Sequence, residues 1–370
     1  MGKLLLFHNN APSTPPRTYK SFMRDTVESV IQNVVIHNSY GNRNTGTYLM
    51  TDTLRKIVKA DELIPRFYQF SEHVDTVVTN ILHRISANLK VDIPYWENIL
   101  KYADRVIALS LGFAFQGGVI APLDKSMERL LHILADRAEI GVRSEYDAEF
   151  LFSYGIKNLC VIGCPSLFYH MDRDFQVDNT QHDVKSVNFN FTTDFSNLGI
   201  TQTEAVDIHW QLLQYFILKY ENKEFTVDYT MQKPPFAEIC DIHSVLLSYG
   251  EVHHFYTECG RYFYSVKDWI DGIKDKNDFS IGSRFHGNIA AILAKVPTLM
   301  INVDKRMKGM NDYYNIPSID INEFDKSKPI EYYRNLADYS KFNKNYAKTY
   351  DNFVNYCKRN GVNLYTIKED

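Results

Sequence analysis

The stretch that decides the fold is DFSIGSRFHGNIAAILAKVPTLMINV, residues 278–303. It begins with a short apolar strand that ends at Gly282, continues with a helix of small and apolar residues, and closes with a second apolar strand after Pro297. This order is typical of a parallel βαβ unit. Arg284 and His286 stand between the strand and the helix, although a buried helix does not need charged or titratable residues at its start. The junction therefore predicts a site at which something outside the chain is held.

The same alternation of strands and helices extends over both halves of the chain. It is interrupted at residues 169–181, a polar and non-periodic stretch that we interpret as a linker. We therefore expect an α/β fold with two doubly wound parallel sheets, the first domain at 1–170 and the second at 171–335. Aromatic residues at helical spacing predict a helix within 336–370 that bridges the domains. No strand is expected to cross from one sheet to the other.

The composition excludes several classes of protein. With a formal net charge of -4 over 370 residues, the chain has no basic excess for coating nucleic acid. The apolar run near the N-terminus is too short for a secretory signal, and the uncharged stretch 106–123 is broken by glycines and a proline, so no transmembrane segment is expected. The five cysteines do not form a disulfide pattern, and Cys160 and Cys164 are expected to be buried rather than to bind a metal. We expect a cytoplasmic, reduced protein without a metal site.

Basic side chains follow two consecutive strands in the second half of the chain. Arg284 and His286 come after the first strand, and Lys305 and Arg306 come after the second. The carboxyl ends of neighbouring parallel strands lie at one edge of a sheet, where helix N-termini attract anions. Arginine adds a bidentate donor, and histidine adds a group that exchanges a proton near neutral pH. We expect these four side chains to surround one anion.

The first half repeats this design with Arg143, which also stands between a strand and a helix. The glycine-bearing loop at 38–46 makes Asn44 and Gly46 candidate ligand contacts, and Gln116 is a third. This loop is neither a P-loop nor a dinucleotide fingerprint, because it has no Gly-Lys-Ser/Thr and no Gly-x-Gly-x-x-Gly. At each candidate position the alternative is structural: an arginine paired with a carboxylate, an interior histidine, or a solvated run of charges.

Residues 283–317, SRFHGNIAAILAKVPTLMINVDKRMKGMNDYYNIP, resemble the signature of the polysaccharide pyruvyl transferase family. The shared pattern is Arg-x-His after a strand, a small-residue helix that ends in Val-Pro, a strand, and an aspartate with basic residues nearby. Residues 140–168 resemble a second block of the family, in the same order and at the same separation. The chain departs from the family at three positions: Thr47 replaces a frequent acidic residue, Ser144 a frequent aspartate, and Arg306 the lysine of some members.

The resemblance implies a GT-B-like fold, in which two Rossmann-type domains face each other across a cleft. It implies that the enolpyruvyl group of phosphoenolpyruvate is moved onto two hydroxyls of a sugar, giving a pyruvate ketal and phosphate, in cell-surface polysaccharide biosynthesis. Arg143, Arg284, Lys305 and Arg306 would then hold the two anionic groups of the donor, and His286, with Arg284 beside it, would protonate the vinyl carbon. The donor is a substrate, so no cofactor is expected. A sugar or lipid-linked oligosaccharide acceptor would be compatible with peripheral association with a membrane.

Two alternatives stay open at this stage. A GT-B glycosyltransferase would hold the diphosphate of a nucleotide sugar in the same cleft, and Glu323, Asp325 and Glu331 offer acidic groups for its ribose. A catalytically idle glycan-binding protein would use its many tyrosines as platforms for sugar rings.

Overall fold

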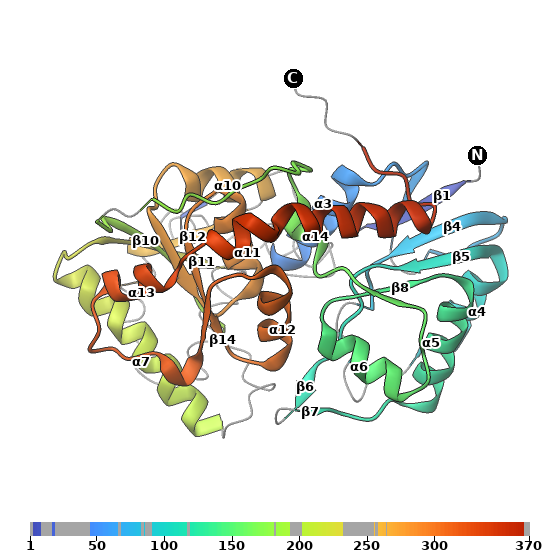
Figure 1. Ribbon diagram of the computed structural model, residues 1–370, viewed down its shortest axis with the longest axis horizontal. Coiled ribbons are helices and arrows are strands. Elements are labelled where there is room, and N and C mark those ends of the chain that lie inside the picture. The colour runs from blue at the N-terminus through green and yellow to red at the C-terminus, as the bar shows by residue number, and fades with distance from the viewer. Residues whose placement is uncertain are drawn as a thin grey trace, which may run out of the picture.

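The computed structural model contains two main parallel sheets surrounded by helices (Figure 1). The residues that it describes are 3–8, 17–18, 45–65, 68–82, 85, 91–116, 119–180, 183–192, 202–231, 255, 258–263 and 265–365. The strand expected directly before the loop at 38–46 lies outside them. Within the described residues, the predicted α/β class with parallel sheets is confirmed.

The first sheet comes from the N-terminal half of the chain. Its four parallel strands, in spatial order, are β3 (Glu62–Pro65), β1 (Leu4–His8), β4 (Val74–Thr79) and β5 (Ala103–Ala108). A parallel bridge between Leu111 and Val142 extends it to a pair of short strands, β8 (Ile140–Val142) and β9 (Leu159–Val161). Its helices are α3 (Thr45–Ile57), α4 (Ile93–Tyr102), α5 (Lys125–Arg137) and α6 (Glu145–Ser153). A hairpin of β6 (Phe115–Gln116) and β7 (Val119–Ile120) lies beside them.

The second sheet has the strand order of a Rossmann fold. In spatial order its parallel strands are β15 (Ser318–Asp320), β14 (Thr298–Asn302), β13 (Phe279–Gly282), β10 (Ser186–Asn190), β11 (Thr226–Met231) and β12 (Gly260–Tyr262). Chain order and spatial order therefore reverse between β10 and β13, as in doubly wound dinucleotide-binding folds. A seventh strand, β2 (Arg17–Thr18), pairs antiparallel with β12. This short segment of the N-terminal half does join the second sheet, contrary to the expectation that no strand crosses.

Helices cover both faces of the second sheet. Phe189 of β10 stacks on Phe216 of α7 (Gln202–Glu221), with ring centroids 4.1 Å apart. The next residue, Asn190, donates its amide N–H to the Asn288 side chain of α11 (Phe285–Leu293) at 2.7 Å. Because neighbouring residues of a strand point to opposite faces, α7 and α11 lie on opposite sides of the sheet. The predicted doubly wound arrangement is thus present in this sheet.

Two helices begin differently from what the sequence predicts. Helix α11 begins at Phe285, so His286 lies in its first turn and not in a loop before it. A further helix, α12 (Lys305–Tyr314), forms where we expected only a charged strand end. Its N-cap is Asp304, whose carboxylate accepts a hydrogen bond from the Met307 N–H at 2.7 Å. An aspartate often caps the start of a helix. Here lysine and arginine follow it directly, so the sequence also fits a run of charges at the end of a strand.

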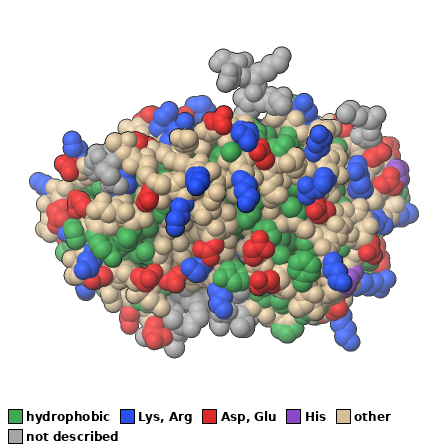
Figure 2. All heavy atoms as spheres, in the orientation of Figure 1, with side chains coloured by type: hydrophobic (Ala, Val, Ile, Leu, Met, Phe, Trp, Pro, Cys, Tyr) green, Lys and Arg blue, Asp and Glu red, His purple; other side chains and the backbone are tan. Residues whose placement is uncertain are grey.

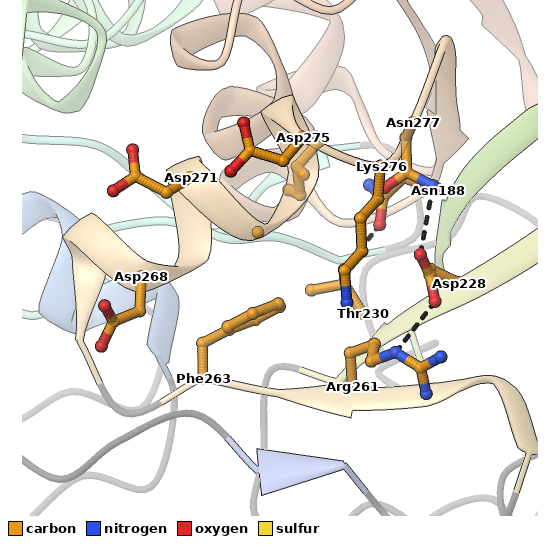
Figure 3. Close-up of a pocket in the computed structure, with 12 residues that line it drawn as sticks. Asn188, Asp228, Thr230, Arg261, Phe263, Asp268, Asp271, Asp275, Lys276 and Asn277 are labelled. Atoms are coloured by element: carbon orange, nitrogen blue, oxygen red, sulfur yellow. Dashed lines mark hydrogen bonds and ion pairs between the residues drawn. The ribbon is translucent and has the colours of Figure 1, made fainter.

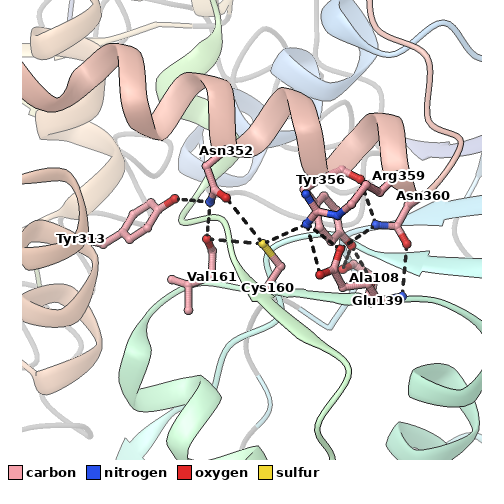
Figure 4. A network of polar contacts seen from close by, with 9 residues as sticks. All are labelled: Ala108, Glu139, Cys160, Val161, Tyr313, Asn352, Tyr356, Arg359 and Asn360. Atoms are coloured by element: carbon pink, nitrogen blue, oxygen red, sulfur yellow. Dashed lines mark hydrogen bonds and ion pairs between the residues drawn. The ribbon is translucent and has the colours of Figure 1, made fainter.

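Helix α14 (Ser340–Arg359) contacts elements of both sheets (Figure 4). The Tyr356 hydroxyl donates to the carbonyl of Glu139 at 2.8 Å, just before β8. The Asn352 amide donates to the carbonyl of Val161 at 2.7 Å and to the Tyr313 hydroxyl at 2.9 Å, which belongs to α12. The remaining short helices are the 3₁₀ turns η1 (Pro165–Phe168) and η2 (Ile321–Glu323), α10 (Val266–Lys274) and α13 (Ile330–Leu336).

The surface shows a mixture of charges on the face drawn in Figure 2, where lysine and arginine side chains alternate with aspartate and glutamate. Among the described residues, no helix combines the length and the apolar character that crossing a membrane requires.

Candidate functional site

The Ser-Arg-Phe-His-Gly segment lies at the point where the second sheet reverses its strand order. The Ser283 N–H donates to the carbonyl of Asn190 at 3.1 Å, and the Arg284 N–H donates to its side-chain oxygen at 2.9 Å. Gly282 permits this approach, because a Cβ there would lie 2.2 Å from the Asn190 carbonyl oxygen. The carboxyl ends of β10 and β13 are thus joined directly. Ligands of doubly wound folds bind beyond the strand ends at such a reversal.

Arg284 is the N-cap residue of α11, an unusual place for an arginine. Its side chain makes no capping hydrogen bond, and the first turn of α11 contains no acidic residue. Its Nε donates to the carbonyl of Phe191, and the residue is 8% exposed. The N-terminus of a helix carries partial positive charge, and the guanidinium of Arg284 adds to it. The start of α11 therefore has the electrostatics of an anion site.

His286 lies one residue into α11 and is half-buried. Its Nε2 is 3.6 Å from the Sγ of Cys164, which belongs to the segment after β9. Cys164 is fully buried, and its Sγ is also 3.1 Å from the Ser166 hydroxyl. The histidine at the end of one sheet is thus in contact with a residue at the end of the other.

The segment that carries Cys164 is fixed by Tyr314 of α12. The Tyr314 hydroxyl donates to the carbonyl of Cys164 at 2.9 Å and also contacts that of Ile162 at 3.2 Å. Gly163 between them has a φ of +71°, and a Cβ there would lie 2.1 Å from the tyrosine oxygen. Only glycine satisfies both conditions, because it tolerates positive φ and has no side chain. The backbone at residues 162–164 therefore holds the thiol toward the histidine.

Arg143 stands at the end of β8 and is 1% exposed. Its Nε donates to the carbonyl and hydroxyl of Ser110 at 3.1 and 2.9 Å, and its Nη2 lies 3.3 Å from the sulfur of Met50. Burial lowers the pKa of this guanidinium, and the nearby Cys164 thiol acts in the opposite direction. No carboxylate of the described residues forms an ion pair with it. A buried cation with neutral partners is costly, which indicates that a further anion belongs beside it.

The acid near Arg143 is Asp147, but its carboxylate is already occupied. It accepts hydrogen bonds from the Ser144 hydroxyl at 2.6 Å and from the backbone N–H of Phe113 at 2.9 Å. Burial raises the pKa of Asp147, so its negative charge is disfavoured at this position. Asp147 therefore does not replace the missing counter-ion of Arg143.

Arg306, the second residue of α12, also lies near Arg143. Its positive charge lowers the pKa of Arg143 and of Asp147. Among the described residues, its Nη2 makes one weak contact, at 3.5 Å from the Asp304 carboxylate, and its Nε has no hydrogen bond. Lys305 is exposed and forms no ion pair within the described part of the chain. The structure thus brings Arg143, Arg306 and His286 together around Cys164 and leaves Lys305 at the surface.

Of the three candidate loop contacts, the structure describes Gly46 in full. Asn44 lies outside the described residues, and so does the side chain of Gln116, whose backbone belongs to β6. Gly46 is buried in the first turn of α3, a helix that packs against η1 and α11. In the ranges that the structure describes, no group of three or more His, Cys, Asp or Glu residues is placed to hold a metal ion.

Sequence analysis predicts that Cys164 is buried, but it does not predict that this thiol faces His286. The two residues are 122 positions apart, and periodicity carries no information about contacts over that distance. The available signal was the position of Cys164 directly after a strand, at the same edge as Arg143. Ser110, which holds Arg143, follows β5 in the same way.

The chain is an α/β protein in which the reversal point of a Rossmann sheet carries the buried Arg284 and the half-buried His286, and His286 contacts Cys164 near the buried Arg143. The family model described as Polysaccharide pyruvyl transferase matches residues 87–305, which is more than half of the chain. The chain belongs to this family. No curated protein sequence matches it.

Three solved structures illustrate how distant its structural neighbours are. A functionally uncharacterised protein from Klebsiella pneumoniae is 11% identical, with a TM-score of 0.40 over 84% of this chain and 88% of the other. UDP-GlcNAc 2-epimerase from Methanocaldococcus jannaschii is 9% identical, with a TM-score of 0.42 over 96% and 99%. WaaG, a glycosyltransferase of lipopolysaccharide biosynthesis, is 11% identical, with a TM-score of 0.36 over 95% of both chains.

Proposed function

We propose that the chain transfers the enolpyruvyl group of phosphoenolpyruvate to two hydroxyls of a sugar and forms a pyruvate ketal. The observation that carries this proposal is the buried Arg143, which has neutral hydrogen-bond partners and lies near the histidine and arginine of the second sheet. A donor with both a phosphate and a carboxylate would supply a counter-charge for Arg143, which forms no ion pair with a carboxylate of the described residues.

The donor would be held between the two sheets. Arg143 on one side and Arg284 and Arg306 on the other would share its two anionic groups, and the start of α11 would add backbone N–H donors. Arg143 and Arg284 are 1% and 8% exposed, so a donor would reach them only when the covering segments move. Closure over the bound donor would exclude water, which strengthens these electrostatic contacts. Lys305 would contribute long-range attraction from the surface.

The chemistry would begin at the methylene carbon of the donor. Protonated His286 would give its proton to that carbon, and the adjacent carbon would become an oxocarbenium-like centre. One sugar hydroxyl would attack this centre and lose its proton to the neutral histidine. The bond to phosphate would then break, and the second hydroxyl would attack the same carbon, with its proton leaving on the phosphate. The products would be the ketal and inorganic phosphate, and His286 would end protonated as it began.

The acceptor would be a sugar, either free or within a lipid-linked or polymeric precursor of a cell-surface polysaccharide. Attack by two hydroxyls on one carbon requires that both lie on the same sugar ring. The site would act from the cytoplasm, where phosphoenolpyruvate is available, and a lipid-linked acceptor would bring the protein to the membrane surface.

Phosphate release from phosphoenolpyruvate in the presence of a panel of sugars and oligosaccharides tests this proposal. We expect at least one acceptor to release phosphate, and NMR of the product to show the new methyl group of a ketal. The Arg284→Ala variant is the control for background hydrolysis. Consumption of a nucleotide sugar with no use of phosphoenolpyruvate would overturn the proposal in favour of a glycosyltransferase.

A further inference from the structure

A cavity of about 290 Å³ lies between the second sheet and α10 (Figure 3). We call it the α10 pocket, and its lining includes Asp228, Thr230, Arg261, Phe263, Lys276 and Asn277. This volume is at the lower end for small-molecule sites, which start at about 300 Å³. The pocket is thus large enough for one ring-sized ligand.

The floor of the α10 pocket is polar, which is unusual for a sheet face beneath a helix. Asn188 pairs with Asp228 across β10 and β11, and Thr230 pairs with Arg261 across β11 and β12. All four side chains point to the same face, and all four line the pocket. Parallel sheets covered by helices normally present valine, isoleucine and leucine at such positions. Because buried polar groups reduce stability unless they are bonded, this floor calls for a reason beyond packing.

Part of the hydrogen-bonding capacity of the floor is used internally. The Thr230 hydroxyl donates to the Asn188 side-chain oxygen at 2.6 Å. The Asp228 carboxylate forms an ion pair with the Arg261 Nε at 2.9 Å and accepts from the Asn277 amide at 3.3 Å. These contacts fix the orientation of the polar groups and balance the charges of Asp228 and Arg261.

Further donors and acceptors remain for a ligand. Within the described residues, the Arg261 Nη2 and the Lys276 Nζ form no hydrogen bond or ion pair, and the carboxylate of Asp228 keeps unused lone pairs. Lys276 extends from the end of α10 over the pocket, whereas the carboxylates of Asp268 and Asp271 point away from it (Figure 3). Donors and acceptors therefore alternate over a short distance. Hydroxyl groups suit such a wall, because each of them both donates and accepts.

One wall of the α10 pocket is aromatic. The ring of Phe263 lies against Gly272 of α10, where a Cβ would be 2.6 Å from a ring carbon. The absence of a side chain at Gly272 therefore lets the ring lie flat against the helix. An apolar ring surface opposite Asp228, Arg261 and Asn277 matches a ligand with one C–H face and a rim of hydroxyls.

We propose that the α10 pocket binds a neutral monosaccharide unit. Phe263 contacts the C–H face of its ring, and Asp228, Arg261, Lys276 and Asn277 bind its hydroxyls. A strongly anionic ligand is disfavoured, because the carboxylate of Asp228 already balances the charge of Arg261, which leaves Lys276 as the one basic group of the described lining without an ion pair.

This site is separate from the candidate active site. Lys276 and Asn277 precede β13, whereas Arg284 follows it, and Arg261 lies on β12, three strands away from β13 in the sheet. The four residues of β13 span about 13 Å. No residue that lines the α10 pocket belongs to the candidate active site. The saccharide in this pocket is therefore bound independently of phosphoenolpyruvate.

Saturation-transfer NMR on the full chain tests the proposal, with glucose, galactose, mannose and N-acetylglucosamine as probes and no phosphoenolpyruvate present. We expect at least one of the four sugars to receive saturation. Lys276→Ala removes one charge-assisted contact and should weaken that binding about tenfold or more. Phe263→Leu keeps an apolar contact with Gly272 but removes the aromatic face, and it should also weaken binding. Lys274→Ala, an exposed lysine of α10 that does not line the pocket, is the matched control.

Three results would overturn the proposal. The first is that none of the four sugars receives saturation at about 10 mM, a concentration that would largely fill a site with a Kd of about 1 mM. The second is that both Phe263→Leu and Lys276→Ala, shown by thermal melts to be folded, bind like the wild type. The third is that Arg284→Ala abolishes the signal, which would place the sugar at the candidate active site. Because the assay contains no donor, its outcome does not depend on whether the chain transfers enolpyruvyl groups.

Discussion

The two strand-to-helix junctions that carry Arg143 and Arg284 share a sequence order but differ in how their helices begin. Helix α6 has Ser144 as its N-cap, which accepts the Asp147 N–H, and it carries two acidic residues in its first turn. Helix α11 has Arg284 itself as N-cap, with no capping side chain and no acid. The cap and the acidic residues of α6 compensate the partial positive charge at its N-terminus, whereas α11 has no such groups in its first turn. Similar motifs therefore differ in electrostatics: the helix after Arg143 carries its own cap and acidic residues, and the helix after Arg284 has neither in its first turn.

The largest effect is expected at His286, in the first turn of α11. His286→Gln should keep the fold and much of the donor affinity but reduce turnover by about 10²–10⁴, because the general acid is lost. Tyr146 occupies the matching second position of α6, and Tyr146→Phe should leave turnover within about twofold of wild type, since no proton is assigned to it. Single-turnover experiments at saturating phosphoenolpyruvate measure the rate of the chemical step in both variants. A near-wild-type rate in His286→Gln would remove this residue from the acid role.

The next largest effect concerns the two arginines. Arg143→Met and Arg284→Ser should each weaken donor binding by about one to two decades, because each removes a charge-assisted contact of roughly 1.5–3 kcal/mol. Without donor, Arg143→Met should be neutral or about 1–3 kcal/mol more stable, since it removes a buried charge that lacks a counter-ion. Arg284→Ser supplies the missing N-cap and should add about 0.5–1 kcal/mol.

Urea unfolding, with and without phosphoenolpyruvate, measures both quantities in the two variants. A strong loss of stability in Arg143→Met, together with an unchanged donor-induced stabilisation, would mean that this arginine is purely structural.

A smaller effect is expected at the contact that joins the two junctions. Cys164→Ala removes the group next to His286 Nε2 and should reduce turnover by about two- to tenfold, the range of one ordinary hydrogen bond. Cys164→Ser keeps a hydrogen-bonding group and should recover most of the rate. The pH profile of turnover and the NMR titration of His286 should shift in the alanine variant but not in the serine variant. Identical titrations in all three proteins would show that the thiol does not position the histidine.

The smallest predicted effect concerns the attachment of α11 to the linker. His170 contacts the carbonyl of Leu293 at 2.9 Å, and burial lowers the pKa of its imidazole. A histidine with a lowered pKa binds fewer protons in the folded state than in the unfolded state. Its contribution is therefore complete above the unfolded pKa of about 6.5 and is lost as the pH falls below it.

Unfolding free energies measured between about pH 7.5 and 5 should fall more steeply in the wild type than in His170→Gln, because glutamine does not titrate. Parallel curves for the two proteins would contradict this assignment.

The sequence was sufficient to predict the alternation of strands and helices and the positions at which the strands end. The strands that end before Arg143 and Arg284 and the helix α14 lie close to where their patterns predict them. The periodicity of apolar residues reflects local burial, and local burial is what these elements share. It does not specify where a helix starts, so His286 was expected in a loop and α12 was missed, although Asp304 is a good N-cap.

Long-range pairing was the other part that the sequence did not reveal. The pairing of β2 with β12 joins residues 17–18 to residues 261–262, and a two-residue strand has no periodic signal. The contact of Cys164 with His286 and the polar floor of the α10 pocket arise in the same way, from strands and helices that meet only after folding. The domain limits at 170 and 335 and the assigned roles of the site residues stay predictions.

The contacts of α14 have a consequence for the order in which the protein matures on the ribosome. Tyr356 is translated 217 residues after Glu139 and 248 residues after Ala108, the two backbone positions that its hydroxyl contacts. Domains usually fold as they emerge during synthesis, the N-terminal one first. Here the edge of the first sheet lacks part of its covering until α14 has left the exit tunnel. A nascent chain that stalls before this point would expose aromatic side chains that are buried in the complete protein, and these would be binding sites for chaperones. The complete fold is therefore reached late in translation.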